Sequence, residues 1–156
     1  GVADTFELAF YKAQEAAGTK LPVEGNVLLT VADKDKPTLL PIARNLKKLG
    51  FNIYATEGTA KFLEEKGIET IPIKKVHEGR PNIADAIKND EIQLVVNTPS
   101  GRRSNEDDSY IRKAAIRHGV PYMTTLAAAC AAVQGIAAFR ADPGQMQSLQ
   151  AYHKAL

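Results

Sequence analysis

Short apolar runs alternate along the chain with longer segments in which apolar residues recur every three or four positions. The apolar runs predict buried strands at residues 26–31, 51–55, 70–73, 93–97 and 121–123. The longer segments predict helices at residues 4–17, 37–50, 59–67, 82–88, 108–118, 125–139 and 145–154. This alternation is typical of a three-layer α/β protein, in which helices cover both faces of a parallel, five-stranded sheet.

Two of the predicted helices have features that bear on how they pack. The helix at residues 4–17 has one apolar face, made of Phe6, Ala9, Phe10, Ala13 and Ala17. The helix at residues 37–50 contains Pro41, which either kinks it or falls within its first turn. Asp35, just before this helix, is expected to cap it.

The strand-to-helix turn at residues 55–60 combines two hydroxyls with a glycine. The first turn of a helix has unsatisfied N–H groups and a partial positive charge, so it is suited to an anion. Gly58 allows close approach of a ligand, and Thr56 and Thr59 each offer a further hydrogen bond. The alternative is that Thr56 or Thr59 caps the helix.

Four polar loops follow predicted strands, at residues 30–36, 55–59, 74–80 and 97–107. Because ligands of parallel sheets bind at the carboxyl ends of the strands, these loops predict one binding edge. Its candidate phosphate ligands are the two lysines and two threonines Lys36, Lys75, Thr56 and Thr59. The alternative is that these side chains are merely solvated.

Two further polar residues stand at the same edge. Asn97 either hydrogen-bonds a base or sugar, or holds the loop after its strand. Asp107 either accepts from a ribose hydroxyl or a base N–H, or caps the helix that follows.

Composition narrows the function classes. The 156 residues carry 20 basic and 18 acidic side chains, and a net charge of +2 argues against a nucleic-acid partner. No apolar run approaches the roughly 20 residues of a membrane span. The single cysteine, Cys130, fits a reducing compartment, and we expect a cytoplasmic protein. His77 has no second ligand at metal-binding spacing, so no metal site is expected.

Four segments resemble motifs of one family, in the same order along the chain. Residues 4–18 resemble FxxAFxKAQxAAG, and residues 75–89 resemble KVHEGRPxIxDxIKN. Residues 97–103 resemble NTxSGRR, and residues 122–126 resemble YxTTL. These motifs belong to the carbamoyl phosphate synthetase large subunit. The chain therefore resembles the C-terminal allosteric domain of the bacterial-type subunit, which has a methylglyoxal synthase-like, Rossmann-like fold.

The resemblance implies a regulatory domain that binds nucleotides, UMP as inhibitor and IMP as activator, at one overlapping site. The phosphate contacts that it implies are Lys36, Thr56, Gly58, Thr59 and Lys75, with Thr30 beside the phosphate-side loop. The base and ribose contacts that it implies are Asn97, Thr98 and Asp107. Thr125 is implied to couple the domain to the ornithine region of the parent enzyme.

The resemblance also implies that the chain, which lacks an initiator Met, is a piece of a longer enzyme. Residues 1–25 would then be a helix and linker from the preceding domain. Residues 26–141 would be the effector-binding domain, and residues 142–156 a helical tail. The parent would be a glutamine-hydrolysing, ATP-dependent carbamoyl phosphate synthetase of pyrimidine and arginine biosynthesis. It would use Mg or Mn and a glutaminase small subunit, whereas no cofactor is expected in this domain.

Two other functions remain open on the sequence. The first is a methylglyoxal synthase-like lyase acting on dihydroxyacetone phosphate. Arg80 stands where that family has its catalytic aspartate, and an arginine is not a base near neutral pH, so no catalytic residue is expected. The second is a domain that only packs against its neighbours. The effector's identity is also open, since some family members respond to N-acetylglutamate and Pro99 replaces a frequent threonine.

Overall fold

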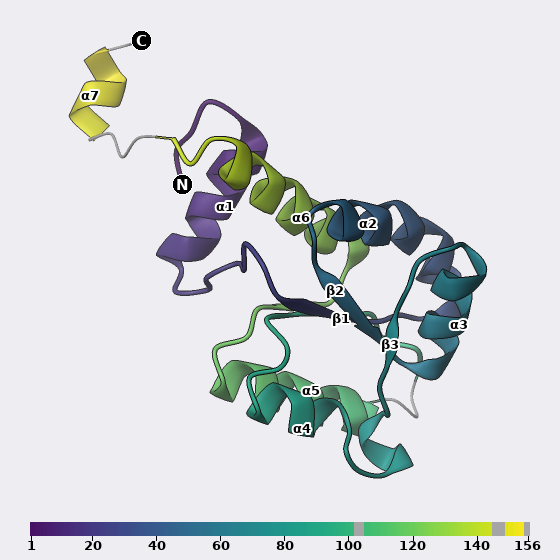
Figure 1. The fold of residues 1–156 in the computed structure, drawn as a ribbon. Coiled ribbons are helices and arrows are strands. Elements are labelled where there is room, and N and C mark those ends of the chain that lie inside the picture. The colour runs from purple at the N-terminus through teal and green to yellow at the C-terminus, as the bar shows by residue number, and fades with distance from the viewer. Residues whose placement is uncertain (102–104, 145–148, 155–156) are drawn as a thin grey trace.

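The computed structural model describes residues 1–101, 105–144 and 149–154, which form a sheet covered by helices on both faces (Figure 1). The strands are β1 (Asn26–Thr30), β2 (Asn52–Ala55), β3 (Ile71–Pro72), β4 (Leu94–Asn97) and β5 (Tyr122–Met123). The helices are α1 (Phe6–Ala16), α2 (Lys36–Lys48), α3 (Glu57–Glu65), α4 (Ile83–Lys88), α5 (Asn105–Arg117), α6 (Leu126–Ala141) and α7 (Leu149–Lys154). Two short 3-10 turns are η1 (Asp33–Asp35) and η2 (Val76–Glu78).

All strand pairs are parallel, and the strand order is β3-β2-β1-β4-β5. The predicted fold class, a three-layer α/β protein with a five-stranded parallel sheet, is therefore confirmed. The chain starts in the centre, moves outward to β3 and then returns to the other side of β1. This places a topological switch point between β1 and β4, where Thr30 is paired in register with Asn97.

The central strand has apolar side chains on both faces, as expected for a buried parallel strand. Val27 and Leu29 belong to the larger core, with α2, α3, α6 and Tyr11 of α1. Leu28 points the other way and packs with α4 and α5. Figure 1 shows α4 and α5 as the layer on one side of the sheet, with α1, α2 and α6 on the other.

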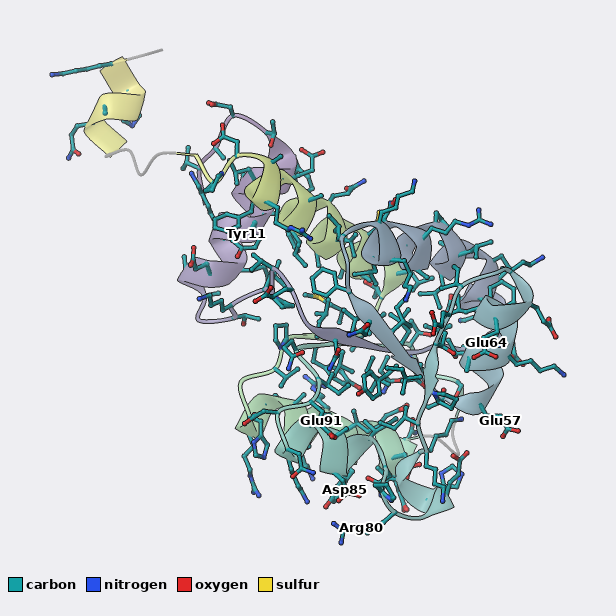
Figure 2. The ribbon with its side chains drawn as sticks, in the orientation of Figure 1. Tyr11, Glu57, Glu64, Arg80, Asp85 and Glu91 are labelled. Atoms are coloured by element: carbon teal, nitrogen blue, oxygen red, sulfur yellow. The ribbon has the colours of Figure 1, made fainter. Side chains whose placement is uncertain are left out.

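The predicted apolar face of α1 is partly wrong. Phe6 is 70% exposed, whereas Tyr11, which lies outside that face, is only 2% exposed (Figure 2). Tyr11 stacks on Phe139 of α6, with ring centroids 4.2 Å apart. The reason is that α1 packs on one helix and not on the sheet. The contact passes through Gly135 of α6, where an added Cβ would lie 3.0 Å from the Glu7 carbonyl oxygen.

Element boundaries differ from prediction where local chemistry decides them. Helix α3 begins at Glu57, so Gly58 and Thr59 lie in its first turn. Edge strand β3 is only two residues long, because it pairs on one side alone and Pro72 has no N–H to donate. Helix α2 continues through Pro41, and Asp35 occupies its N-cap position without a side-chain capping bond. Residues 145–148, and 102–104 of the NTxSGRR segment, lie outside the described residues.

Candidate functional site

A polar cleft of about 640 Å³ opens at the carboxyl ends of β1 and β4, at the switch point. It contains every effector contact that the sequence predicts, brought together from six segments of the chain. These residues are Thr30, Lys36, Thr56, Gly58, Thr59, Lys75, Asn97, Thr98 and Asp107. Their role in binding stays a prediction, but their convergence on one cleft is a property of the fold.

The threonine hydroxyls hold the loop that follows β1. The Thr56 hydroxyl donates to the Thr30 hydroxyl over 3.0 Å. Thr59 Oγ1 accepts from the Val31 N–H at 3.2 Å, and Thr98 Oγ1 accepts from the Ala32 N–H at 2.9 Å. All four threonines are buried. Their first task is therefore to shape the cleft, because hydroxyl atoms already bonded to the loop are less available to a ligand.

The first turn of α3 is left open to the cleft. Thr56 occupies its N-cap position, but its side chain bonds Thr30 and makes no capping hydrogen bond. The capping interpretation of Thr56 is therefore wrong, and so is that of Thr59, which lies inside the helix as its third residue. A nine-residue helix with uncapped N–H groups in its first turn offers donors and partial positive charge to an anion.

The ammonium group of Lys36 lies against this turn. A Cβ on Gly58 would stand 3.3 Å from Lys36 Nζ, so the glycine makes room for the charge beside the helix end. The Lys36 side chain is only 17% exposed, and its Nζ is 2.6 Å from Asp33 Oδ1. Lys75, from the loop between β3 and α4, lines the same cleft. Together they offer two point charges and backbone donors, which is the chemistry that binds phosphate.

Asp33 competes for the lysine that an anion would use. The Lys36 hydrogen bond and charge, and the more distant Lys75, hold the pKa of the Asp33 carboxyl below its ordinary value, so it is ionised at neutral pH. Its side chain is nevertheless 95% exposed, so water screens the pair and the contact is weak.

We therefore expect Asp33→Asn to strengthen phosphate binding roughly two- to fivefold, since Lys36 then has no anionic neighbour to exchange. Titration calorimetry with inorganic phosphate measures this, with Asp35→Asn as the matched control. Equal or weaker affinity in Asp33→Asn would show that Asp33 does not compete at this site.

Asn97 serves the fold with its amide nitrogen. Nδ2 donates to Asp108 Oδ1 at 2.9 Å and to the Tyr122 hydroxyl at 2.7 Å. Burial raises the pKa of the Tyr122 phenol, which stays protonated at neutral pH. Both amide hydrogens of Asn97 are thus engaged in hydrogen bonds within the protein. This agrees with the interpretation in which Asn97 holds the loop after its strand. Only Oδ1 remains to recognise a ligand, and it does so as an acceptor from a base N–H or a sugar hydroxyl.

Asp107 connects the first turn of α5 to the 3-10 turn η2. Its Oδ2 accepts from the His77 N–H at 3.3 Å and lies 2.5 Å from His77 Nδ1. His77 lines the cleft and was not among the predicted contacts. From the sequence, His77 was expected only not to be a metal ligand, because nothing near it indicates a contact with a residue 30 positions away. Its place in the same turn as Lys75 is the signal that could have found it.

Thr125, the predicted coupling residue, does not line the cleft. It is the N-cap of α6, where its hydroxyl oxygen accepts from the Ala128 N–H at 3.1 Å. Thr125 therefore has a structural role, because it caps the N-terminal end of α6. A coupling role for Thr125 stays a prediction.

Two further features are absent from the described residues. Within residues 1–101, 105–144 and 149–154, no cluster of three His, Cys, Asp or Glu side chains has the geometry to hold a metal ion. The same ranges contain no helix with the length and apolar character needed to span a bilayer.

Comparison with known proteins places this chain in a family. Residues 38–124, more than half of the chain, match the family model of the MGS-like domain. The chain belongs to the MGS-like domain family. A solved methylglyoxal synthase from Elizabethkingia anophelis NUHP1 has the same fold, with a TM-score of 0.56 at 19% identity. That alignment covers 86% of this chain and 93% of the synthase.

Relatives with much higher identity are several times longer than this chain. The chain is 52% identical over 136 residues to the carbamoyl phosphate synthase large chain, C-terminal section, of Aquifex aeolicus (strain VF5), covering 87% of this chain and 25% of that protein. It is 49% identical over 156 residues to the carbamoyl phosphate synthase large chain of Gemmatimonas aurantiaca, covering 100% of this chain and 14% of that protein. The sequence resemblance is thus confirmed, and this MGS-like domain spans a minor part of these relatives.

Proposed function

We propose that this MGS-like domain is the regulatory domain of a carbamoyl phosphate synthase large chain. In this proposal its cleft binds a nucleotide monophosphate, of the type in which UMP inhibits and IMP activates. The bound effector changes the conformation of the parent enzyme and so controls it. A ligand does this only to the extent that its affinity differs between the two conformations.

The observation that carries the proposal is the open first turn of α3 beside Lys36 Nζ. It provides a phosphate cradle at one part of the cleft, while Asn97 Oδ1 and the Asp107 carboxylate provide acceptors for a ribose or base. The cleft volume of about 640 Å³ falls within the range of small-molecule sites. Relatives named as carbamoyl phosphate synthase large chains support the choice of parent.

For the parent protein, the proposal is a glutamine-hydrolysing synthase that uses ATP with Mg or Mn and works with a glutaminase small subunit. It would supply carbamoyl phosphate to pyrimidine and arginine biosynthesis. The domain itself would bind no cofactor and perform no catalysis.

The decisive experiment is titration calorimetry of the 156-residue chain with UMP, IMP, N-acetylglutamate and inorganic phosphate. We expect Lys75→Ala to weaken binding of the nucleotide that binds best by about tenfold, because one charged contact to phosphate is lost. Lys74→Ala is the matched control, since Lys74 is exposed and does not line the cleft. No binding of any ligand would contradict the effector function and favour a domain that only packs against its neighbours. Unchanged affinity in Lys75→Ala would remove Lys75 from the site.

A lyase acting on dihydroxyacetone phosphate is the second candidate, and the His77–Asp107 pair in the cleft favours it. A histidine held by a carboxylate is a common general base. Against it, Arg80, at the position expected for the catalytic aspartate, does not line the cleft and is ion-paired with Asp85 beside α4 (Figure 2). A coupled assay with dihydroxyacetone phosphate decides, since turnover lost in His77→Asn would establish the lyase.

A further inference from the structure

The outer face of α5 is basic and apolar, and no part of the described chain covers it. Tyr110 is 46% exposed and Ile116 is 66% exposed, so two large apolar side chains of this helix face solvent. Arg112, Lys113 and Arg117 are exposed around Ile116. We call these five residues the α5 surface. Helix α5 lies with α4 on the side of the sheet opposite to α1, α2 and α6 (Figure 1).

The cations of the α5 surface have no ion-pair partner in the part of the chain that the structure describes. Among the described residues, none of Arg112, Lys113 and Arg117 forms an ion pair within 4.0 Å. The sequence from residue 109 to residue 119 contains no acidic residue at all. Lys88 of α4 adds a further cation at the border, with its Nζ 5.6 Å from the centre of the Tyr110 ring. An apolar centre with an unpaired basic rim is the pattern of an interface for an acidic partner.

The same helix also reaches the cleft. The first turn of α5 carries Asp107, which bonds His77, and Asp108, which accepts from Asn97. A ligand that hydrogen-bonds to Asn97 or Asp107 therefore perturbs the hydrogen bonds that hold the N-terminal end of α5 in place. A rigid helix displaced at one end moves at its outer face as well, because cores and helices shift as packed units.

We propose that the α5 surface docks onto an acidic, apolar-centred surface of the remainder of the large chain, and that α5 carries the effector signal to it. This inference rests on the proposed function. Its occupant is argued from length, because the chain spans only 14% of the Gemmatimonas aurantiaca large chain and the remainder is tethered to it at high effective concentration. A second copy of the domain is disfavoured, since a two-fold contact would place the unpaired cations of this surface against themselves.

The test uses the full-length large chain with its small subunit. Lys113→Glu combined with Arg117→Glu reverses two exposed charges four residues apart on α5. Arg44→Glu combined with Lys48→Glu is the matched control, with the same spacing and exposure on α2. Each enzyme is measured for nucleotide binding by calorimetry, for the effector-induced change in synthase activity, and for hydrogen exchange along α5.

The α5 double variant is expected to bind the nucleotide with unchanged affinity, while the effector-induced change in activity falls about fivefold or more. Hydrogen exchange at Tyr110–Arg117 is expected to rise in the variant, and the α2 control is expected to match the wild type in all three measurements. Unchanged regulation in the α5 variant would overturn the proposal. Two results of the hydrogen-exchange measurement would also overturn it. Protection of α5 that depends on enzyme concentration would indicate a second copy as the partner, and protection that depends on added RNA would indicate a nucleic acid.

Failure of this inference is distinguishable from failure of the proposed function. Loss of nucleotide binding in wild type contradicts the effector function, whatever α5 does. Retained binding and retained regulation in the α5 variant contradict only the docking surface.

Discussion

Lys36→Ala is expected to weaken phosphate-bearing effectors about 30-fold or more, the largest loss of any single substitution in the cleft. The Lys36 side chain is mostly buried, and its ammonium lies against the first turn of α3. The Thr56 side chain does not cap this helix, so the N–H groups of the turn stay available to a ligand. A charged hydrogen bond in such partly buried surroundings is worth roughly 1.5–3 kcal/mol, and loss of the charge beside the helix end adds to it. Calorimetry with the nucleotide that binds best measures the loss.

Lys36→Arg serves as the companion variant, because it keeps the charge but changes its shape beside Gly58. We expect it to retain more affinity than Lys36→Ala, and Lys48→Ala at the other end of α2 to leave affinity unchanged. Thermal unfolding of each variant without ligand checks that the fold is intact. If Lys36→Ala binds as well as wild type, the phosphate does not lie at the start of α3.

Leu29→Ala is expected to lower the free energy of unfolding by about 3 kcal/mol, the largest effect on stability considered. Leu29 is fully buried in the central strand and belongs to the larger core that joins the sheet to α2 and α6. Truncation removes three carbon atoms and leaves a cavity that paired strands on both sides prevent from collapsing. Urea denaturation followed by circular dichroism provides the measurement.

Ile116→Ala is the comparison for this variant, because the side chain is mostly exposed in the domain. It is expected to change the free energy of unfolding by about 0.5 kcal/mol at most. Similar losses for Leu29→Ala and Ile116→Ala would contradict the core assignment.

The sequence was sufficient for the architecture because its signals are local and repeated. Apolar runs such as residues 26–31 and 93–97 are too short for helices and are separated by helical periodicity, which is typical of a parallel sheet. The face of α1 was misjudged because periodicity shows that a helix has an apolar side but does not reveal what it packs against. Tyr11 is buried against Phe139 and Gly135, which lie more than 120 residues away in the sequence. The sequence around α1 contains no signal of this contact.

The sequence predicted which residues line the candidate site but not which hydrogen bonds they make. Strand ends and motifs placed Thr56, Asn97 and Asp107 at one edge, and all of them line the cleft. Their hydrogen bonds were not predictable, since each partner comes from another segment. Thr56 bonds Thr30, Asn97 bonds Asp108 and Tyr122, and Asp107 bonds His77. For Thr56, local rules predict a helix cap, and the bond to Thr30 replaced that cap.

The strand order also determines when the cleft comes into existence during folding. Strand β1 pairs first along the sequence with β2, but its other edge must wait for β4, through the pairing of residues 27 and 94. We expect this pairing to form after the local contacts, because closing so long a loop costs more entropy than they do. A nascent chain that ends before β4 has the turn of α3 but lacks Asn97 and Asp107. An effector that bridges the two sides therefore binds only the completed fold, and its binding free energy is added to that state alone.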